Sequence, residues 1–431
     1  MEKQKKNLGS VAFLPLIVFL VCYVGCGITF TLMGADDPFG KFPRHVALLA
    51  GCAVALLLNR SIDVKDKLNI MTTNMGNSGV MMIVLIYLMA GGFQGAAAAM
   101  GGKDSVVNLC LHVIPVTFLI PGVFLMCCFI STSIGTIAAM APIAINVAQG
   151  AHLNVAIVGA AVIGGSYFGD NLSMISDTTI SAAEGCGSEM KDKFKMNFFI
   201  ALPAAIVAMI LYSVVGGTGS GAIKAGSYNI IEVLPYLIVL GAALMGINVA
   251  VVLFVGILSA GIIGLCVGSC GFFDWIQAIG NGMSDMFSIS MVAILVSGII
   301  GIVREYGGVE WLVGTISGKI KNRRGAEYGI GLMSGILSAA MVNNTIAIIV
   351  TCPIAKEIGE KYKIAPKRLA SLVDIFACAF ISLMPHDGGM LMITALADVS
   401  PLNVLKYSFY MFGLIIATCV TIQFGLMDEK N

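Results

Sequence analysis

The chain has 431 residues, of which 58% are hydrophobic and 11% are charged. Soluble domains carry about 25% charged residues, so this chain cannot cover itself with a polar surface and is predicted to be an integral membrane protein. Its net charge of +1 gives no reason to expect a nucleic-acid partner.

Apolar runs that could cross the bilayer as α-helices, which takes about 20 residues each, follow one another along the chain. Sustained alternation of the kind found in membrane β-barrels is lacking, so an all-α polytopic helical bundle is predicted. The first run follows the charged segment MEKQKK but is too long for a signal peptide, and we interpret it as a retained helix. Uninterrupted helices are predicted near residues 10–33, 43–58, 77–100, 196–216, 230–246, 247–266, 284–303 and 407–426.

Four further apolar regions are interrupted by polar residues. Regions 112–149 and 326–357 contain "STSIGT" and "MVNNT" midway, and we interpret them as re-entrant hairpins. Regions 153–186 and 369–397 contain "GGSYFGDNLSMISDTT" and "LMPHDGG", and we interpret them as broken helices. Polar backbone at membrane depth is tolerated only where it lines a cavity or is buried in protein, so these four interruptions are expected to meet at a site.

The basic residues favour one orientation of this topology. If each hairpin enters and leaves on one side, all but five of the 25 Lys and Arg residues fall on the side of the N-terminus. Lys191, Lys193 and Lys195 are counted there, in a cytoplasmic segment before the helix near residues 196–216. Cytoplasmic loops are rich in Lys and Arg, so both termini are expected in the cytoplasm and the protein in the cytoplasmic (inner) membrane. The exceptions are Lys41, Arg44, Lys103, Lys224 and Lys406.

Landmarks recur at a nearly constant distance along the chain. Pro142 and Pro353 are 211 residues apart, and Asp177 and Asp387 are 210 apart. The first hairpin would enter from outside and the second from inside, which predicts two inverted repeats, the architecture of many secondary transporters. The predicted division is residues 1–216 for the first repeat, 217–229 for a linker and 230–431 for the second repeat.

The first broken helix carries two aspartates, Asp170 and Asp177, about two helical turns apart. A carboxylate at the bilayer centre is costly, and Na⁺, like other hard cations, prefers oxygen ligands. These residues predict a Na⁺ site with both aspartates as direct ligands; the alternative is a buried polar network that holds the unwound segment together. The expected ion-binding residues are Asp170, Asn171, Ser173, Asp177, Thr178 and Thr179.

The hairpin tips and the second broken helix would form the opposite wall. Their hydroxyl groups could instead join neighbouring helices. His386 is interpreted either as a proton carrier or as a buried histidine bonded to a carbonyl group, and Asp374 as a partner for a neighbouring helix. The expected substrate-binding residues are Thr132, Ser133, Thr136, Asn343, Asn344, Thr345, His386, Asp387 and Gly388.

Other kinds of site are weakly supported. No two of the 12 cysteines form a CxxC pair and the four histidines are scattered, so neither zinc nor another cofactor is expected beyond Na⁺ and H⁺ as transported or coupling ions. A hydrolase built on Ser382, His386 and Asp387 is disfavoured, because adjacent His and Asp residues rarely orient each other as a triad requires. The chain is therefore not expected to be an enzyme.

The segment "YFGDNLSMISDTT" resembles the signature of the NhaC-type Na⁺/H⁺ antiporters, in which a GD-x-x-S-P-x-SDTT run follows a TS-x-GT hairpin. "TSIGT" at residues 132–136 and "FGDNLSMISDTT" at 168–179 match that order, although Met174 stands where the family usually has proline. In the second half, "VNNTIAIIV" and "PHDGG" are more similar to the amino-acid and organic-acid transporters of the same ion transporter superfamily. The resemblance implies a scaffold and a moving transport part built from hairpins and broken helices.

Two functions remain open from the sequence. The first is a Na⁺/H⁺ antiporter with alternating access, in which Na⁺ and H⁺ compete for the aspartate pair. The alternative is a Na⁺-coupled transporter of an amino acid or organic acid, whose solute would lie between "NNT" and "HDGG". A channel fits inverted broken helices less well. The expected partners are the lipid bilayer, a small cation and, in the alternative, a small organic solute; a homodimer is compatible with the sequence.

Overall fold

The computed structural model describes residues 7–33, 41–113, 115–130, 133–173, 176–216 and 226–427. Over these residues the secondary structure is helical, with no β-strand. Six helical segments in this part of the chain are long and apolar enough to cross a membrane. The predicted all-α membrane fold is therefore confirmed.

The helices follow one another with short connections. Before residue 217 they are η1 (Gly9–Phe13, a 3₁₀ helix), α1 (Leu14–Leu32), α2 (Arg44–Leu57), α3 (Val64–Met75), α4 (Ser78–Ala99), α5 (Gly102–Val113), α6 (Val116–Cys128), α7 (Ser133–Gly150), α8 (Val155–Asn171), α9 (Asp177–Cys186) and α10 (Met190–Gly216). After residue 225 they are α11 (Ile230–Leu244), α12 (Val249–Val267), α13 (Phe272–Asp285), α14 (Phe287–Glu305), α15 (Gly308–Ser317), α16 (Arg323–Met341), α17 (Asn344–Tyr362), α18 (Pro366–Ser382), α19 (Gly388–Ala397), α20 (Pro401–Leu405) and α21 (Phe409–Phe424).

The eight helices predicted from uninterrupted apolar runs are all present, as η1 with α1 and as α2, α4, α10, α11, α12, α14 and α21. Most ends lie within about three residues of the prediction, the usual uncertainty of element boundaries. The exception is α10, which begins at Met190 and not at residue 196. Lys191, Lys193 and Lys195, which the sequence analysis placed before this helix, therefore belong to its first two turns.

Five helices were not predicted: α3, α5, α13, α15 and α20. The sequence of α13, FFDWIQAIGNGMSD, contains two glycines and an asparagine, which weaken an isolated helix. Its partner α4 compensates by direct backbone contact: a Cβ atom at Gly91 would lie 2.1 Å from the carbonyl oxygen of Gly282. Small residues allow such close approach between membrane helices, so packing that only the fold creates stabilises α13.

The four expected interruptions all occur as breaks between helices. At each break, backbone N–H and C=O groups at the two helix ends have no partner within a helix. The breaks separate α6 from α7 after Cys128, α8 from α9 after Asn171, α16 from α17 after Met341 and α18 from α19 after Ser382. The inverted relation of the two halves stays a prediction, and residues 217–225 of the expected linker lie outside the described residues.

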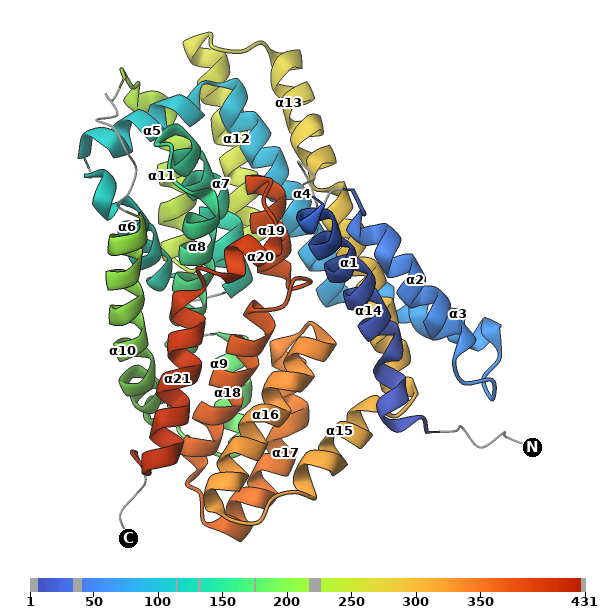
Figure 1. Ribbon diagram of the computed structural model, residues 1–431. Helices are drawn as coiled ribbons and strands as arrows, with labels where there is room; N and C mark the ends of the chain where they lie inside the picture. The colour runs from blue at the N-terminus through green and yellow to red at the C-terminus, as the bar shows by residue number, and fades with distance from the viewer. Residues whose placement is uncertain are drawn as a thin grey trace.

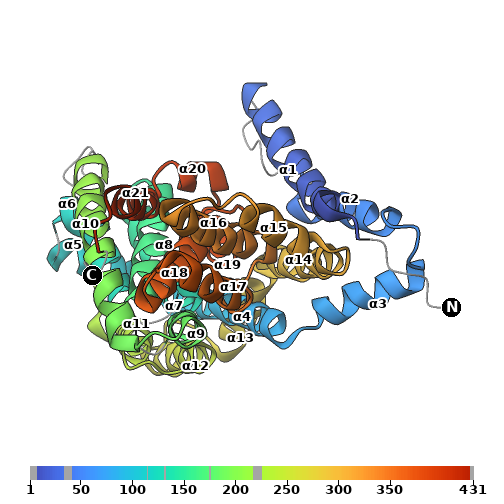
Figure 2. The same ribbon diagram turned by 90° about the horizontal axis from the view of Figure 1, so that it is seen from below.

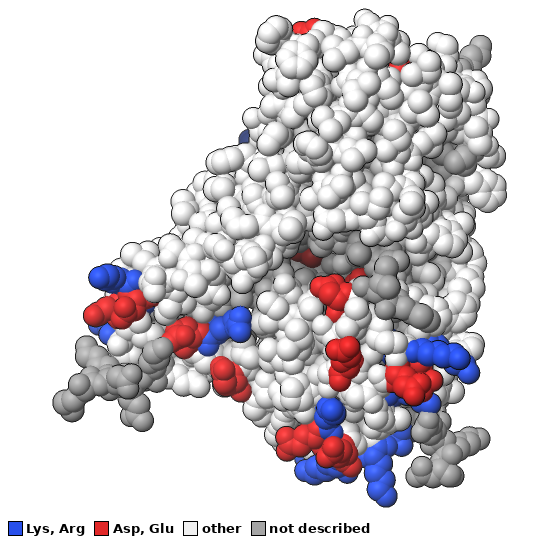
Figure 3. All heavy atoms as spheres, turned by 180° about the vertical axis from the view of Figure 1, so that it is seen from behind, with Lys and Arg blue, Asp and Glu red and all other residues white. Residues whose placement is uncertain are grey.

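The breaks lie between an upper and a lower group of helices in Figure 1. Helices α9, α16 and α17 lie in the lower part, towards which both ends of the described chain also run, whereas α7, α8 and α19 lie in the upper part. Helices α1, α2 and α3 pack on α14 at one side of the molecule, away from α9 and α18 (Figure 2). Charged side chains gather at the lower end of the face shown in Figure 3, and the surface above them is almost without charge.

Because α4 and α13 are in backbone contact, replacing a glycine by alanine there should destabilise the protein more than the same change at an open position. Gly91→Ala places a methyl group against the Gly282 carbonyl and should lower stability by about 1–3 kcal/mol, the usual range for overpacking. Gly241→Ala is the matched control, because a Cβ atom there meets nothing within 4 Å. Thermal unfolding of the purified protein in detergent measures both. Equal melting temperatures for the two variants would contradict this packing.

Candidate ion site

The break between α8 and α9 encloses the carboxylate of Asp170, whose side chain is 1% exposed. The Ser176 hydroxyl donates a hydrogen bond to Oδ1. The Thr178 hydroxyl donates to Oδ2 over 3.2 Å, and the Cys378 thiol is 3.7 Å from the same oxygen. Within the described part of the chain, no Lys, Arg or His side chain lies within ion-pair distance of Asp170. Asp170 is therefore a buried carboxylate whose direct partners are neutral hydroxyl and thiol groups.

A fully buried ion pair lies beside this carboxylate. The Lys193 ammonium on α10 is 2.6 Å from Asp374 Oδ2 on α18, and both side chains are 0% exposed. The same Asp374 oxygen accepts a hydrogen bond of 2.9 Å from Asn197, one turn after Lys193. Removing a charge from water is costly unless it is paired and hydrogen-bonded, and this pair meets both conditions. The expectation that Asp374 pairs with a neighbouring helix thus has a defined partner, Lys193.

The backbone of the break takes part in this cluster. The carbonyl oxygen of Asn171 accepts hydrogen bonds from Lys193 over 3.2 Å and from Asn197 over 3.0 Å. The Thr179 hydroxyl donates to the carbonyl oxygen of Asp170 over 3.2 Å and accepts from Lys193 over 2.6 Å. These carbonyl groups lie in the last turn of α8, where carbonyl groups have no partner four residues further along the same helix, although the Asp170 oxygen also accepts from the Ser173 N–H over 3.2 Å. The interruption of the helix thus supplies oxygen atoms that an unbroken helix would keep for itself.

Asp177 lies in different surroundings from Asp170. It is exposed in the first turn of α9, where the helix dipole favours a negative charge. The Thr345 hydroxyl, from the tip of the second hairpin, donates to its Oδ2 over 2.8 Å. The two aspartates share no hydrogen-bond partner among the described residues. The structure therefore does not place both carboxylates around one set of ligands.

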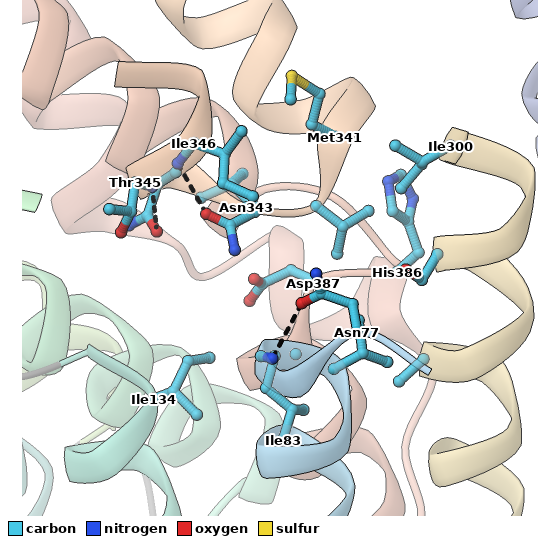
Figure 4. Close-up of a pocket in the computed structure, with 18 of the residues that line it drawn as sticks. Asn77, Ile83, Ile134, Ile300, Met341, Asn343, Thr345, Ile346, His386 and Asp387 are labelled. Carbon is cyan, nitrogen blue, oxygen red and sulfur yellow. Dashed lines mark hydrogen bonds between the residues drawn. The ribbon is translucent and has the colours of Figure 1, made fainter. Parts of the chain in front are cut away.

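A cavity of about 280 Å³ lies against Asp177 and the second hairpin tip. In Figure 4, Asn343, Thr345 and Ile346 border it on one side, His386 on another, and Asp387 lies between them. The cavity is much larger than one water molecule, whose share of liquid volume is about 30 Å³. It therefore has room for a hydrated cation or a small organic solute, and Asp170 is not among the residues that line it.

Asp387, at the cavity, caps a helix. Its Oδ2 accepts hydrogen bonds from the backbone N–H groups of Gly389 and Met390, which caps the N-terminus of α19. The Tyr167 hydroxyl donates to Oδ1 over 3.3 Å, and the Tyr87 hydroxyl donates to the carbonyl oxygen of Gly388 over 2.9 Å. The "HDGG" break is thus held by two tyrosines from α8 and α4.

His386 contacts a backbone carbonyl group and an aromatic ring. Its Nε2 is 3.0 Å from the carbonyl oxygen of Ala339, and its ring packs edge-on against Phe19. The Ser382 hydroxyl donates instead to the carbonyl oxygen of Ala379. The interpretation of His386 as a buried histidine bonded to a carbonyl group therefore has a named partner. Among the described residues, no hydrogen bond joins Ser382, His386 and Asp387, the three residues of the disfavoured hydrolase.

The remaining expected residues divide between the cluster and the cavity. Ser173 accepts a hydrogen bond from the backbone of Ser176 and steadies the break. Ser133, Asn343, Asn344 and Gly388 line the cavity, whereas Thr136 is fully buried in α7 and does not. Thr132 lies outside the described residues.

Sequence reasoning missed Ser176, Lys193, Asn197 and Cys378 as members of the buried cluster. Two spacings in the sequence could have indicated some of these residues. Lys193 and Asn197 are four residues apart, as are Asp374 and Cys378, so each pair occupies one face of its helix.

The different surroundings of the two aspartates can be measured. In a background that lacks the native cysteines, a cysteine at position 177 should react quickly with a membrane-impermeant thiol reagent, because the site is exposed. A cysteine at position 170 should react slowly, because the side chain is enclosed. The labelling rate in proteoliposomes is the readout, and equal rates at the two positions would contradict the separation.

The sequence is similar to known Na⁺/H⁺ antiporters. The profile described as the Na⁺/H⁺ antiporter family matches residues 8–217 and 220–428. The Na⁺/H⁺ antiporter NhaC of Bacillus subtilis is 24% identical over an alignment of 471 residues that covers 100% of both chains. NhaC of Alkalihalophilus pseudofirmus is 22% identical over 69% of this chain and 70% of its own.

Other similar proteins match more narrowly or more distantly. The malate-2H⁺/Na⁺-lactate antiporter of Bacillus subtilis is 24% identical over 49% of this chain, and the match spans only 45% of that relative. Among solved structures, the YdaH transporter of Alcanivorax borkumensis is 12% identical, with a TM-score of 0.41, over 86% of this chain and 90% of that one.

Proposed function

The chain belongs to the Na⁺/H⁺ antiporter family, and on this premise we propose that it exchanges Na⁺ for protons at Asp170. The observation that carries the proposal is the enclosure of this carboxylate among hydroxyl groups, with no basic side chain of the described chain within ion-pair distance and the nearby Lys193 already paired with Asp374. A buried carboxylate without a counterion is strongly disfavoured. It must therefore hold either a proton or a metal cation.

The groups around Asp170 suit both occupants. When the carboxylate holds no cation, the Ser176 and Thr178 hydroxyls point their protons towards it. A hydroxyl group also has two acceptor lone pairs, so rotation about one bond presents oxygen to Na⁺. Oxygen is the ligand that hard cations prefer. A protonated carboxylate has lost its attraction for the cation, and this makes the two occupants exclude each other without further machinery.

We assign the second aspartate of the predicted pair a different task. Asp177 faces the cavity, and its charge would attract cations towards the neighbouring break. The cavity shares Asn74 and Arg304 with an adjoining hollow that is also lined by Glu305 and Glu310, at the end of α14 and in α15. Together these two hollows provide a route by which a hydrated cation could approach from one side.

Alternating access is proposed to arise from the helix breaks. The cluster joins α8, α9 and α10, before the central connection, to α18 after it, so a shift between these groups would change the exposure of Asp170. The two segments matched by the family profile divide at residues 218–219, within the expected linker, which supports two related halves. The one-sided distribution of Lys and Arg supports cytoplasmic termini in the inner membrane.

The comparisons do not favour the alternative of Na⁺-coupled solute uptake. The chain belongs to the Na⁺/H⁺ antiporter family, and the two NhaC relatives, which match 69% and 100% of this chain, are Na⁺/H⁺ antiporters. The cavity has room for a small organic solute, so an uptake screen of amino and organic acids complements the exchange assay.

Three aspartate-to-asparagine variants test the proposal in everted vesicles or proteoliposomes. Asp170→Asn should abolish Na⁺-driven proton movement, because the amide can neither release a proton nor neutralise Na⁺. Asp177→Asn should raise the apparent Km for Na⁺ and leave exchange measurable, since only the approach is weakened. Asp398→Asn is the matched control, because this residue is exposed at the left-handed C-cap of α19, a conformation that asparagine tolerates. Full exchange by a well-folded Asp170→Asn protein would refute the assignment.

A further inference from the structure

We propose that Lys193 is the permanent countercharge of Asp374, which leaves Asp170 as the single exchanging carboxylate of the buried cluster. Exchange is then one Na⁺ for one proton and moves no net charge across the membrane. This inference rests on the proposed function and adds to it the role of a lysine that does not touch the exchanged ion.

The contacts of Lys193 define its charge state. An ammonium group has three donors and no acceptor. Lys193 Nζ has three acceptors within reach: Asp374 Oδ2 at 2.6 Å, Thr179 Oγ1 at 2.6 Å and the Asn171 carbonyl oxygen at 3.2 Å. The Thr179 hydroxyl uses its own proton on the Asp170 carbonyl oxygen, so it can only accept from the lysine. Each donor of a charged ammonium therefore has one acceptor.

The Lys193 ammonium lies among oxygen atoms that could otherwise bind a metal cation. Its three partners are a carboxylate oxygen, a hydroxyl oxygen and a backbone carbonyl oxygen, the oxygen types that hard cations take in proteins. Because the ammonium is attached to α10, it cannot leave as a free ion. Asp374 is thereby withheld from Na⁺, and the neighbouring carboxylate of Asp170 remains as the place for a mobile cation.

Counting charges in the cluster leads to the stoichiometry. Asp374 and Lys193 cancel, and the other groups in direct contact, which are the hydroxyls of Ser176 and Thr178 and the thiol of Cys378, are neutral. The cluster is neutral with one proton on Asp170 and equally neutral with one Na⁺ there. A second mobile cation would leave an excess charge in a fully buried site, which is strongly disfavoured.

The other ionisable groups nearby lie outside this count. Asp177 on α9 is exposed to the cavity, where water can screen its charge. Asp387 is occupied by two backbone N–H groups and a tyrosine hydroxyl at the start of α19. His386 bonds to the Ala339 carbonyl oxygen on α16.

The stoichiometry is tested with the purified wild-type protein in proteoliposomes. At a fixed pH gradient, we measure the ratio of Na⁺ concentrations across the membrane at which the gradient neither grows nor decays. The measurement is made without a membrane potential and with one of about 100 mV, set by a K⁺ gradient and valinomycin. A cycle that moves one net charge would shift this balance ratio by about 50-fold. We expect no shift, and a shift approaching that size would overturn the proposal by showing that a second proton is carried.

Paired variants separate a fixed countercharge from a proton carrier. Lys193→Gln together with Asp374→Asn replaces a neutral ion pair with two neutral amides, so exchange should persist and the balance ratio should remain insensitive to potential. Lys193→Gln alone leaves Asp374 uncompensated, and we expect at least a tenfold loss of exchange rate. Complete loss of exchange in a well-folded double variant would show that Lys193 carries a transported proton and would overturn the proposal.

Thermal unfolding of the same variants gives a readout that does not depend on transport. Each single replacement should lower the melting temperature more than the double replacement does, because each leaves one buried charge unpaired. If the wild-type protein exchanges no Na⁺ for protons, the proposed function fails. The countercharge role is then contradicted separately only if the double variant is no more stable than the two single variants.

Discussion

The cost of an unpaired carboxylate in a buried, water-poor environment is the constraint on which the rest of the site depends. Asp374 meets that cost with the Lys193 ammonium, 2.6 Å away. Asp170, in contact with the same Cys378 thiol, has hydroxyl donors and no cation among the described residues. Two similar side chains thus acquire different chemistry from their neighbours. In the function that we propose, Asp374 keeps its lysine partner and Asp170 takes a mobile positive charge.

The helix breaks make this difference possible. An unbroken helix through residues 171–177 would use the carbonyl oxygens of Asp170 and Asn171 in its own hydrogen bonds. Because α8 ends at Asn171, those oxygens are free to accept from Thr179, Lys193 and Asn197, in addition to the bond from the Ser173 N–H to the Asp170 oxygen. The second hairpin tip and the "HDGG" break then border the adjoining cavity, so that the polar parts of both halves of the chain lie close together (Figure 4). Breaks of this kind also allow rearrangement, since short helices can move without disrupting a whole span.

Much of the fold could be predicted from the sequence, because long apolar runs and their polar interruptions report directly on the bilayer. Helix α13 could not, since its glycines gain their value only from contact with α4. At the site, the sequence predicted that the polar run 170–179 binds an ion through Asp170 and Asp177, and this stays a prediction; in the structure the two carboxylates share no hydrogen-bond partner among the described residues. Lys193 was not singled out, because it lies with Lys191 and Lys195 in a basic segment that was assigned to the cytoplasmic side. Only the early start of α10 and the packing of α18 against it bring Lys193 to Asp374.

The central claim is that a proton and Na⁺ compete for Asp170. Isothermal titration of Na⁺ into the purified protein, repeated in buffers of different ionisation enthalpy and at several pH values, measures that competition without any transport. We expect about one proton to be released for each Na⁺ bound while Asp170 is protonated, and the apparent Kd for Na⁺ to rise as the pH falls. Asp170→Asn should abolish the proton release. Binding of Na⁺ with unchanged affinity across the pH range and without proton release would contradict it.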